Sequence, residues 1–212
     1  MSTVLVALVM GYLLGSLPFG YLVARTKGVN IFEVGSKNPG ATNVRRVLGS
    51  GPGNLVLALD ALKGAASAGW PLLPFARIEQ AELIGVVGLV AAILGHSFSC
   101  FTGFKGGKSV ATGAGGFLVL FPVGMGVSLA VFALVVLTTR FVSLGSMVGA
   151  ASLPVTAFLL HRSHLLVGVA GAIALFVILR HRANISRLLA GTESRLGRKP
   201  AASASGSPVT KP

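Results

Sequence analysis

The chain has 212 residues, of which 53% are hydrophobic and 11% are charged, and its formal net charge is +13. Soluble domains carry about 25% charged residues, so this composition argues against a water-soluble globule. The hydrophobic residues fall in long uncharged stretches, which are typical of membrane-spanning helices when they reach about 18 residues. The sequence therefore predicts an all-α, polytopic membrane helix bundle.

Few cysteines and acidic residues are present, and this disfavours several chemistries. One cysteine, Cys100, allows no intramolecular disulfide and no cysteine zinc cluster. Two-metal phosphoryl transfer needs several converging carboxylates, and the chain has only five acidic residues. Soluble-type glycerolipid acyltransferases use a histidine shortly before an aspartate, and no histidine lies shortly before Asp60. We expect no metal, no other cofactor and no nucleic-acid partner.

Six apolar runs are the candidate spans. The first lacks a basic leading region and a cleavage site, so it is predicted to be retained rather than removed as a signal peptide. The second carries Asp60 and Lys63, for which we favour an i,i+3 ion pair that faces the bundle. In chain order the runs are Ser2–Ala24, Val47–Ala76, Leu83–Phe104, Ser109–Thr139, Phe141–Leu160 and Ser163–Leu179.

The fourth run has 31 residues and is interrupted at Pro122, and the basic residues decide whether it crosses once or twice. With the amino end outside, two crossings put 15 of the 18 Lys and Arg residues in the cytoplasm, against 8 for one crossing. Cytoplasmic loops collect Lys and Arg. We therefore predict about seven transmembrane helices, an outside amino end and a cytoplasmic carboxyl end. The membrane domain covers residues 1–198, and residues 199–212, rich in Ala, Ser and Pro, form a disordered tail.

The segment Gly35–Arg46, GSKNPGATNVRR, is a candidate anion site. A glycine-rich turn that leads into a helix presents backbone N–H groups to an anion. Ser36 and Asn38 add hydrogen bonds, and Arg45 and Arg46 add charge suited to phosphate. It is not a P-loop, because no G-K-[ST] closes it. The alternative is a polar connector with a helix cap.

The segment Gly95–Thr112, GHSFSCFTGFKGGKSVAT, is a second candidate. Lys105 and Lys108 flank two glycines, so ammonium and backbone groups can approach an anion together. His96 lies roughly 13 Å deeper on a helix and would reach the anion only if the loop folded back. The alternative for His96 is an interhelical hydrogen bond. A weaker signal is GSLPFG at Gly15–Gly20, which a simple kink explains equally well.

The segment His181–Glu193, HRANISRLLAGTE, follows the last predicted span. His181, Asn184 and Arg187 recur at i, i+3 and i+6 and can share one helix face. The alternative is an amphipathic basic helix on anionic lipid headgroups. Ser143, at the start of the sixth span, is predicted on the same side of the membrane.

One membrane face thus gathers two glycine-rich basic loops, a Ser/Asn set and histidines. Such a face suits substrates that carry phosphate groups, and an acyl chain can enter sideways from lipid. An anion transporter and a lipid-binding scaffold remain open as alternatives. The basic groups cluster on one face instead of at the midplane, which argues against transport.

Six ordered blocks resemble the bacterial acyl-phosphate:glycerol-3-phosphate acyltransferases. They cover most of the chain and read GSLPFGYLVAR, GSKNPGATNVRR, DALKG, GHSFSCFTGFKGGKSVAT, RFVSLGS and HRANISRLLAGTE. The resemblance implies a multi-pass enzyme of the bacterial inner membrane with active-site loops facing the cytoplasm. It implies acyl transfer from a long-chain acyl phosphate to the 1-hydroxyl of glycerol 3-phosphate, which gives lysophosphatidic acid and inorganic phosphate. This is the first acylation step of phospholipid biosynthesis. The implied partners also include membrane lipids and the soluble enzyme that makes acyl phosphate.

The resemblance also implies roles for individual residues. His181, Asn184 and Ser143 match catalytic positions, and the Gly35–Gly40 loop matches a cradle for the donor phosphate. Direct attack by the glycerol hydroxyl needs no protein nucleophile, and either His181 or a substrate phosphate takes the proton. The matching phosphate-binding positions are Gly35, Ser36, Asn38, Gly40, Asn43, Arg45, Lys105, Gly106, Gly107 and Lys108.

Three residues depart from the family pattern. Lys37 and Ser109 stand where glycine is usual, and Ser99 stands where proline is usual. A long side chain at position 37 either contacts phosphate or requires a different backbone angle. We expect activity to survive these changes.

Overall fold

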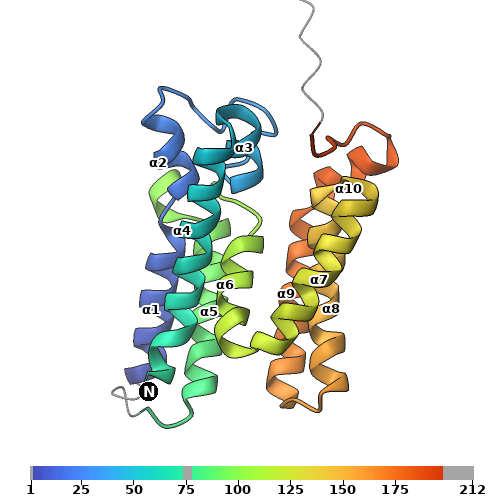
Figure 1. Cartoon of the computed structure of the whole chain (residues 1–212). Helices are drawn as coiled ribbons and strands as arrows, with labels where there is room; N and C mark the ends of the chain where they lie inside the picture. The colour runs from blue at the N-terminus through green and yellow to red at the C-terminus, as the bar shows by residue number, and fades with distance from the viewer. Residues whose placement is uncertain (1, 74–77, 198–212) are drawn as a thin grey trace, which may run out of the picture.

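The computed structural model describes residues 2–73 and 78–197, and every regular element in these ranges is helical (Figure 1). The prediction of an all-α bundle is confirmed for this part of the chain. The predicted tail at residues 199–212 and the boundary at residue 198 lie outside the described residues.

Seven longer helices build the bundle within the described ranges, and three short helices lie at one end of it (Figure 1). The longer helices are α1 (Ser2–Ser16), α4 (Ser50–Gly69), α5 (Ala81–Ser97), α6 (Val110–Leu120), α7 (Pro122–Thr139), α8 (Val142–Leu159) and α9 (His164–Arg180). The short helices are α2 (Phe19–Arg25), α3 (Ala41–Leu48) and α10 (Arg182–Leu189), and the 3-10 turns are η1 (Trp70–Leu72) and η2 (Cys100–Thr102).

The longer helices form two groups. Helices α1, α4, α5 and α6 pack against one another, and α7, α8 and α9 pack together beside them (Figure 1). Glycine allows the close contact of α4 with α6: a Cβ on Gly115 would lie 1.8 Å from the Ala61 carbonyl oxygen, and one on Gly64 would lie 1.9 Å from that of Thr112. Small residues have this use in membranes, where packing rather than water exclusion drives helix association.

One apolar core joins the two groups. Leu89 of α5 and Phe117 of α6 are buried in the same cluster as Ile173 and Val177 of α9. Large apolar side chains also point outward, and Leu137 is 80% exposed. An outer surface of this kind suits a lipid environment.

The predicted interruption at Pro122 is confirmed. Helix α6 ends at Leu120, and α7 begins at Pro122 and turns back along the bundle (Figure 1). Proline fits the first turn of α7 because its missing N–H has no helical partner there. With 11 residues, α6 is only about 16 Å long, which is short for a ~30 Å hydrocarbon core.

The number of spans is settled only in part. Four helical segments are long and apolar enough to cross a membrane, and a fifth joins them if α9 and α10, bent by 58° at their junction, count as one span. Seven crossings also require α4, which carries Asp60 and Lys63, and the short α6. The count of seven therefore stays a prediction. The two ends of the described chain do lie at opposite ends of the bundle, as an odd number requires (Figure 1).

We predict that the α8–α9 connection faces outward and that the segment after α10 faces the cytoplasm. His164→Cys and Thr192→Cys, each in a Cys100→Ala background, introduce exposed thiols at these two places. In sealed right-side-out vesicles, a membrane-impermeant maleimide should label the first variant at once and the second only after permeabilisation. The reverse pattern would invert the topology, and equal labelling of both would show that α9 does not cross the membrane.

Candidate active site

The segments that the sequence singles out meet at one end of the bundle. The loop before α3, α3 itself and α10 lie at the end of the bundle opposite Ser2 (Figure 1). The start of α8 lies at the same end, because α7 has run back from the break at Phe121. The predicted gathering of these segments on one face is therefore present.

Glu193 is the centre of a hydrogen-bonded cluster at this end. Its Oε1 accepts from Ser143 Oγ at 2.7 Å and from Asn184 Nδ2 at 2.6 Å, and its Oε2 accepts from Arg187 Nε at 2.7 Å. Burial raises the pKa of the Glu193 carboxyl, but the three hydrogen bonds and the Arg187 charge outweigh burial and leave it below its usual value. The ionised carboxylate thus orients Ser143 and Asn184, two of the three predicted catalytic residues.

Lys108 brings the other helix group into this cluster. Its Nζ donates to Asn184 Oδ1, which ties the turn before α6 to α10. Burial lowers the pKa of Lys108 to about 8, and the positive charge of Arg187 lowers it too, while Glu193 opposes the shift. Lys108 is therefore mostly protonated at pH 7, and it loses its charge as the pH rises through about 8.

His181 is buried at the junction of α9 and α10, with 3% of its surface exposed. Its Nδ1 lies 2.8 Å from the Val177 carbonyl oxygen. A carbonyl can only accept, so Nδ1 carries the hydrogen and Nε2 keeps a lone pair. Burial and the charge of Lys108 lower the pKa of His181 to about 4. The imidazole is thus neutral at pH 7 and can accept a hydrogen bond.

The Gly35–Gly40 loop is shaped by its own asparagines. Asn43 Oδ1 accepts from the Ser36 N–H at 2.8 Å, and Asn43 Nδ2 donates to the Val34 carbonyl at 3.1 Å. Asn38 Oδ1 accepts from the Gly40 N–H at 2.9 Å. Two of the backbone N–H groups expected to face an anion are therefore engaged inside the loop. The phosphate-binding roles of Asn38 and Asn43 stay predictions, and their observed contacts are structural.

Gly35 is needed for this loop, and Lys37 adopts an unusual backbone. Gly35 has φ +59, and a Cβ on it would lie 2.3 Å from Asn43 Oδ1. Lys37 has φ 55 and an exposed side chain. Left-handed backbone costs an L-residue about 1–2 kcal/mol relative to glycine. Lys37 thus replaces glycine at a position whose backbone conformation glycine would adopt without strain.

The other two departures are also accommodated. Ser109 has φ 60, again left-handed, and its hydroxyl donates to the Ile93 carbonyl at 2.9 Å. Ser99 replaces a usual proline, and its hydroxyl donates to the Ser16 carbonyl at 2.5 Å. Each serine therefore makes a backbone hydrogen bond that glycine or proline has no side-chain donor to form.

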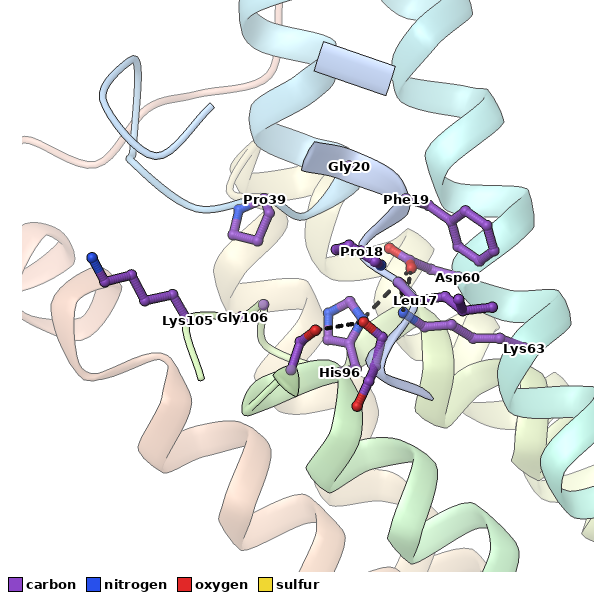
Figure 2. Close-up of a pocket in the computed structure, with 13 residues that line it drawn as sticks. Leu17, Pro18, Phe19, Gly20, Pro39, Asp60, Lys63, His96, Lys105 and Gly106 are labelled. Atoms are coloured by element: carbon purple, nitrogen blue, oxygen red, sulfur yellow. Dashed lines mark hydrogen bonds and ion pairs between the residues drawn. The ribbon is translucent and has the colours of Figure 1, made fainter. Parts of the chain in front are cut away.

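The turn between Lys105 and Lys108 is held from the side by Arg180. Arg180 Nη2 donates to the Gly107 carbonyl at 2.9 Å and to the Gly106 carbonyl at 3.3 Å, and the guanidinium stacks 5.2 Å from the centre of the Phe98 ring. The carbonyl oxygens of the turn are thus bound by Arg180. The N–H groups of Gly106 and Lys108 have no acceptor among the described residues. The exposed side chain of Lys105 points away from the protein interior (Figure 2).

The two anion loops share a small pocket, which Pro39 lines together with Lys105, Gly106 and Gly107 (Figure 2). Helix α3 also lies near the Glu193 cluster, because Arg46 is within range of the charges of Glu193 and Arg187. Within α3, Arg46 donates to Asn43 Oδ1 at 3.4 Å. Burial lowers the pKa of Arg46, Glu193 raises it and Arg187 lowers it, with a net shift down. Ser36, Arg45 and Lys105 are exposed at this end. The predicted residues thus form one continuous region with a buried polar centre and an exposed basic rim.

Comparison with known proteins decides the family. The family model described as glycerol-3-phosphate acyltransferase matches residues 5–191. A glycerol-3-phosphate acyltransferase of Trichormus variabilis is 46% identical over 209 residues, covering 90% of this chain and 91% of the relative. One from Fusobacterium nucleatum is 45% identical, covering 89% and 95%. This chain belongs to the glycerol-3-phosphate acyltransferase family.

Solved structures of the family agree with the fold. A crystal structure of PlsY (YgiH), an integral membrane glycerol 3-phosphate acyltransferase, in its glycerol 3-phosphate form has a TM-score of 0.85 to this chain at 39% identity, covering 92% of this chain and 96% of PlsY. The lysophosphatidic acid form of PlsY gives a TM-score of 0.82 at 38% identity, covering 92% and 95%. This acyltransferase is therefore an integral membrane protein of the same architecture.

Several residues of the acyltransferase site were not found from its sequence. Glu193 ends the last motif and is one of four glutamates in the chain. An acidic residue among several basic ones is therefore the feature of the sequence that could identify it. Arg46 is expected from the sequence only to add charge for phosphate, and Arg180 only to be a basic residue. Arg180 and Gly107 are far apart in the chain, and no local pattern encodes their contact.

Anion binding by the acyltransferase should weaken as pH rises through about 8. Lys108 is charged below its lowered pKa and neutral above it, so a bound phosphate loses one attractive charge. Affinity for inorganic phosphate, measured by equilibrium dialysis in detergent, should fall several-fold between pH 7 and pH 9.5. Lys108→Arg should remove that fall, because arginine stays charged, while Lys105→Arg should keep it. An affinity of the wild type that does not change with pH would contradict the assignment of Lys108 as a phosphate-binding residue.

Proposed function

We propose that this acyltransferase transfers a fatty acyl group from acyl phosphate to the 1-hydroxyl of glycerol 3-phosphate, giving lysophosphatidic acid and inorganic phosphate. The observation that carries the proposal is the Glu193 cluster, which orients Ser143, Asn184 and Lys108 beside a glycine turn suited to phosphate. The names of the relatives, and the substrate and product forms of PlsY, support the acceptor and the product.

The choice of acyl phosphate as donor rests on the motif resemblance and on the charge of the site. The two anion loops meet at one pocket through Pro39 and the turn at Lys105–Gly107. Basic side chains of α3 and α10 lie at the same end of the bundle. Two phosphate-bearing substrates match two loops. An acyl phosphate presents a leaving phosphate that such a site can bind and stabilise.

The reaction then needs no protein nucleophile. The 1-hydroxyl oxygen attacks the acyl carbonyl carbon, a new ester C–O bond forms, and the bond between that carbon and the phosphate oxygen breaks. The phosphate leaves with the electron pair, and the lysines and arginines of the rim stabilise the charge on it. We assign Ser143 and Asn184, fixed by Glu193, to holding glycerol 3-phosphate in line.

The hydroxyl proton has two candidate acceptors. His181, with its pKa lowered to about 4, is a weak base at pH 7, whereas a phosphate monoester has a second pKa near 6. A general base works best when its pKa is near the working pH. We therefore assign the proton of the attacking hydroxyl to a substrate phosphate, and we give His181 Nε2 the role of accepting a hydrogen bond from the other hydroxyl of glycerol 3-phosphate.

The proposed setting is the bacterial inner membrane, with the active-site loops facing the cytoplasm. The basic residues gather at the end of the bundle that holds α3 and α10, as the positive-inside bias requires of a cytoplasmic face. A soluble enzyme that makes acyl phosphate can then deliver it to this face. The product would enter phospholipid biosynthesis at its first acylation step.

The proposal is tested with purified protein in detergent, palmitoyl phosphate and glycerol 3-phosphate, without added magnesium. Phosphate release should require both substrates and yield lysophosphatidic acid. Lys105→Ala should lower kcat/KM by roughly 10–100-fold, because a charge-assisted hydrogen bond to phosphate contributes about 1.5–3 kcal/mol. Lys27→Ala, on an exposed residue of the α2–α3 connection, is the control. Uptake of glycerol 3-phosphate into sealed vesicles without acyl product would instead indicate a transporter.

His181→Ala separates the two proton acceptors. If a substrate phosphate takes the proton, the variant should lose a hydrogen bond only, and kcat should fall about tenfold. A fall of more than about 100-fold would make His181 the base, since general-base catalysis contributes about 10²–10⁴-fold. Full turnover would remove His181 from the chemistry. A parallel melting temperature in detergent shows whether each comparison concerns folded protein.

A further inference from the structure

The helix break at Leu17 and Pro18 leaves backbone carbonyls that need partners. Helix α1 ends at Ser16 and α2 begins at Phe19. Lys63 Nζ donates to the Leu17 carbonyl at 2.9 Å, and Ser99 donates to the Ser16 carbonyl. Non-helical backbone at membrane depth is tolerated only where such groups are satisfied. The break is therefore held from α4 and from the α5–α6 turn.

Lys63 belongs to a buried charged triad. Its Nζ lies 2.9 Å from Asp60 Oδ1, and His96 Nδ1 lies 3.5 Å from the same oxygen. Asp60 and Lys63 are 2% and 4% exposed. The ion pair predicted from the i,i+3 spacing is thus confirmed, and so is the interhelical partner expected for His96. Figure 2 shows the three side chains meeting beside Leu17 and Pro18.

The triad contacts the second anion loop directly and reaches the first through the helix break. On one side, the Gly107 N–H donates to the His96 carbonyl at 3.0 Å, and a Cβ on Gly107 would lie 2.1 Å from His96 Nε2. The loop does fold back onto His96. On the other side, the segment after the break passes so close to the first loop that a Cβ on Gly20 would lie 1.6 Å from the Pro39 carbonyl oxygen. Figure 2 shows Gly106 beside the cluster, and Pro39 and Gly20 above it.

We propose that Asp60, Lys63 and His96 form a positioning network that sets the two anion loops at the correct spacing. Lys63 fixes the break at Leu17 and hence the Gly20–Pro39 contact, and His96 supports the Gly107 turn from below. Asp60 joins the two side chains. This role rests on the proposed function, because the spacing matters for two phosphate-bearing substrates. In this proposal the three side chains act through the loops and not on the reacting atoms.

A purely stabilising ion pair is a poor explanation for the triad. Burying two charges costs desolvation energy, and replacement of a buried pair by apolar residues is often neutral or stabilising. Charged residues inside a membrane are rare unless they have a function. Here the ammonium of Lys63 reaches a backbone carbonyl 46 residues away along the chain, and its partner carboxylate leads to His96. The contacts thus run between elements that carry the two loops.

The test separates folding from positioning. Asp60→Leu combined with Lys63→Met removes both charges together, so no unpaired charge is left buried. The Leu17 carbonyl loses its partner, so the melting temperature in detergent should fall by a few to about ten degrees while the protein stays folded. KM for glycerol 3-phosphate should nevertheless rise about tenfold or more, with kcat changed less than threefold. His96→Ala should act in the same way. His96→Asn, which keeps an amide donor near the position of Nδ1, should recover most of the wild-type KM.

Ser128→Ala is the matched control, because it removes a buried hydrogen bond to the Gly149 carbonyl between α7 and α8. It should leave KM unchanged. A folded double variant with wild-type KM would overturn the proposal. A fall in kcat as large as the rise in KM, with both changes following the melting temperature across the variants, would overturn it too. Binding of glycerol 3-phosphate is also measured without turnover, by its effect on the melting temperature. That measurement tests the network even if palmitoyl phosphate is not the donor.

Discussion

A single ionised carboxylate fixes the polar end of this bundle. The chain is strongly basic, and Glu193 accepts hydrogen bonds from Ser143 of α8 and from Asn184 and Arg187 of α10 within one small volume. Through Asn184 it also holds Lys108, which belongs to the first helix group. The two helix groups also share an apolar core, which does not specify orientation. Glu193, together with the Arg180 contacts to the Gly106–Gly107 turn, therefore helps to determine how the halves of the site face each other.

The glycine turn at Gly106 and Gly107 is placed at the junction of the same two groups. Arg180 of α9 binds its carbonyl oxygens, and His96 of α5 binds the Gly107 N–H. One contact comes from each helix group, so the shape of the turn depends on how the groups pack. The glycines are required because His96 lies against the turn at a distance that no side chain on Gly107 would allow.

The sequence predicted the bundle, the break at Pro122, the Asp60–Lys63 pair and the gathering of Ser143, His181 and Asn184, because apolar length, proline chemistry and motif order are local signals. Partners across long separations were not predictable. Glu193 with Ser143 and Arg180 with Gly107 are 50 and 73 residues apart. The hydrogen bonds of Asn38 and Asn43 within the loop were not predicted for another reason. An asparagine beside a glycine loop can bind either the loop backbone or a ligand, and the sequence alone does not distinguish the two.

The helix break at Leu17 and Pro18, where Lys63 binds a free backbone carbonyl, helps to distinguish an enzyme from a transporter. In transporters, unwound backbone carbonyls at a broken helix coordinate a mobile cation. Here the ammonium of Lys63 binds the Leu17 carbonyl and the Asp60 carboxylate and lies 5.5 Å from the centre of the Phe19 ring. A cation tethered to α4 cannot cross the membrane. Lys63 thus makes the break a rigid support, and a rigid support is what the proposed reaction between two phosphate-bearing substrates needs.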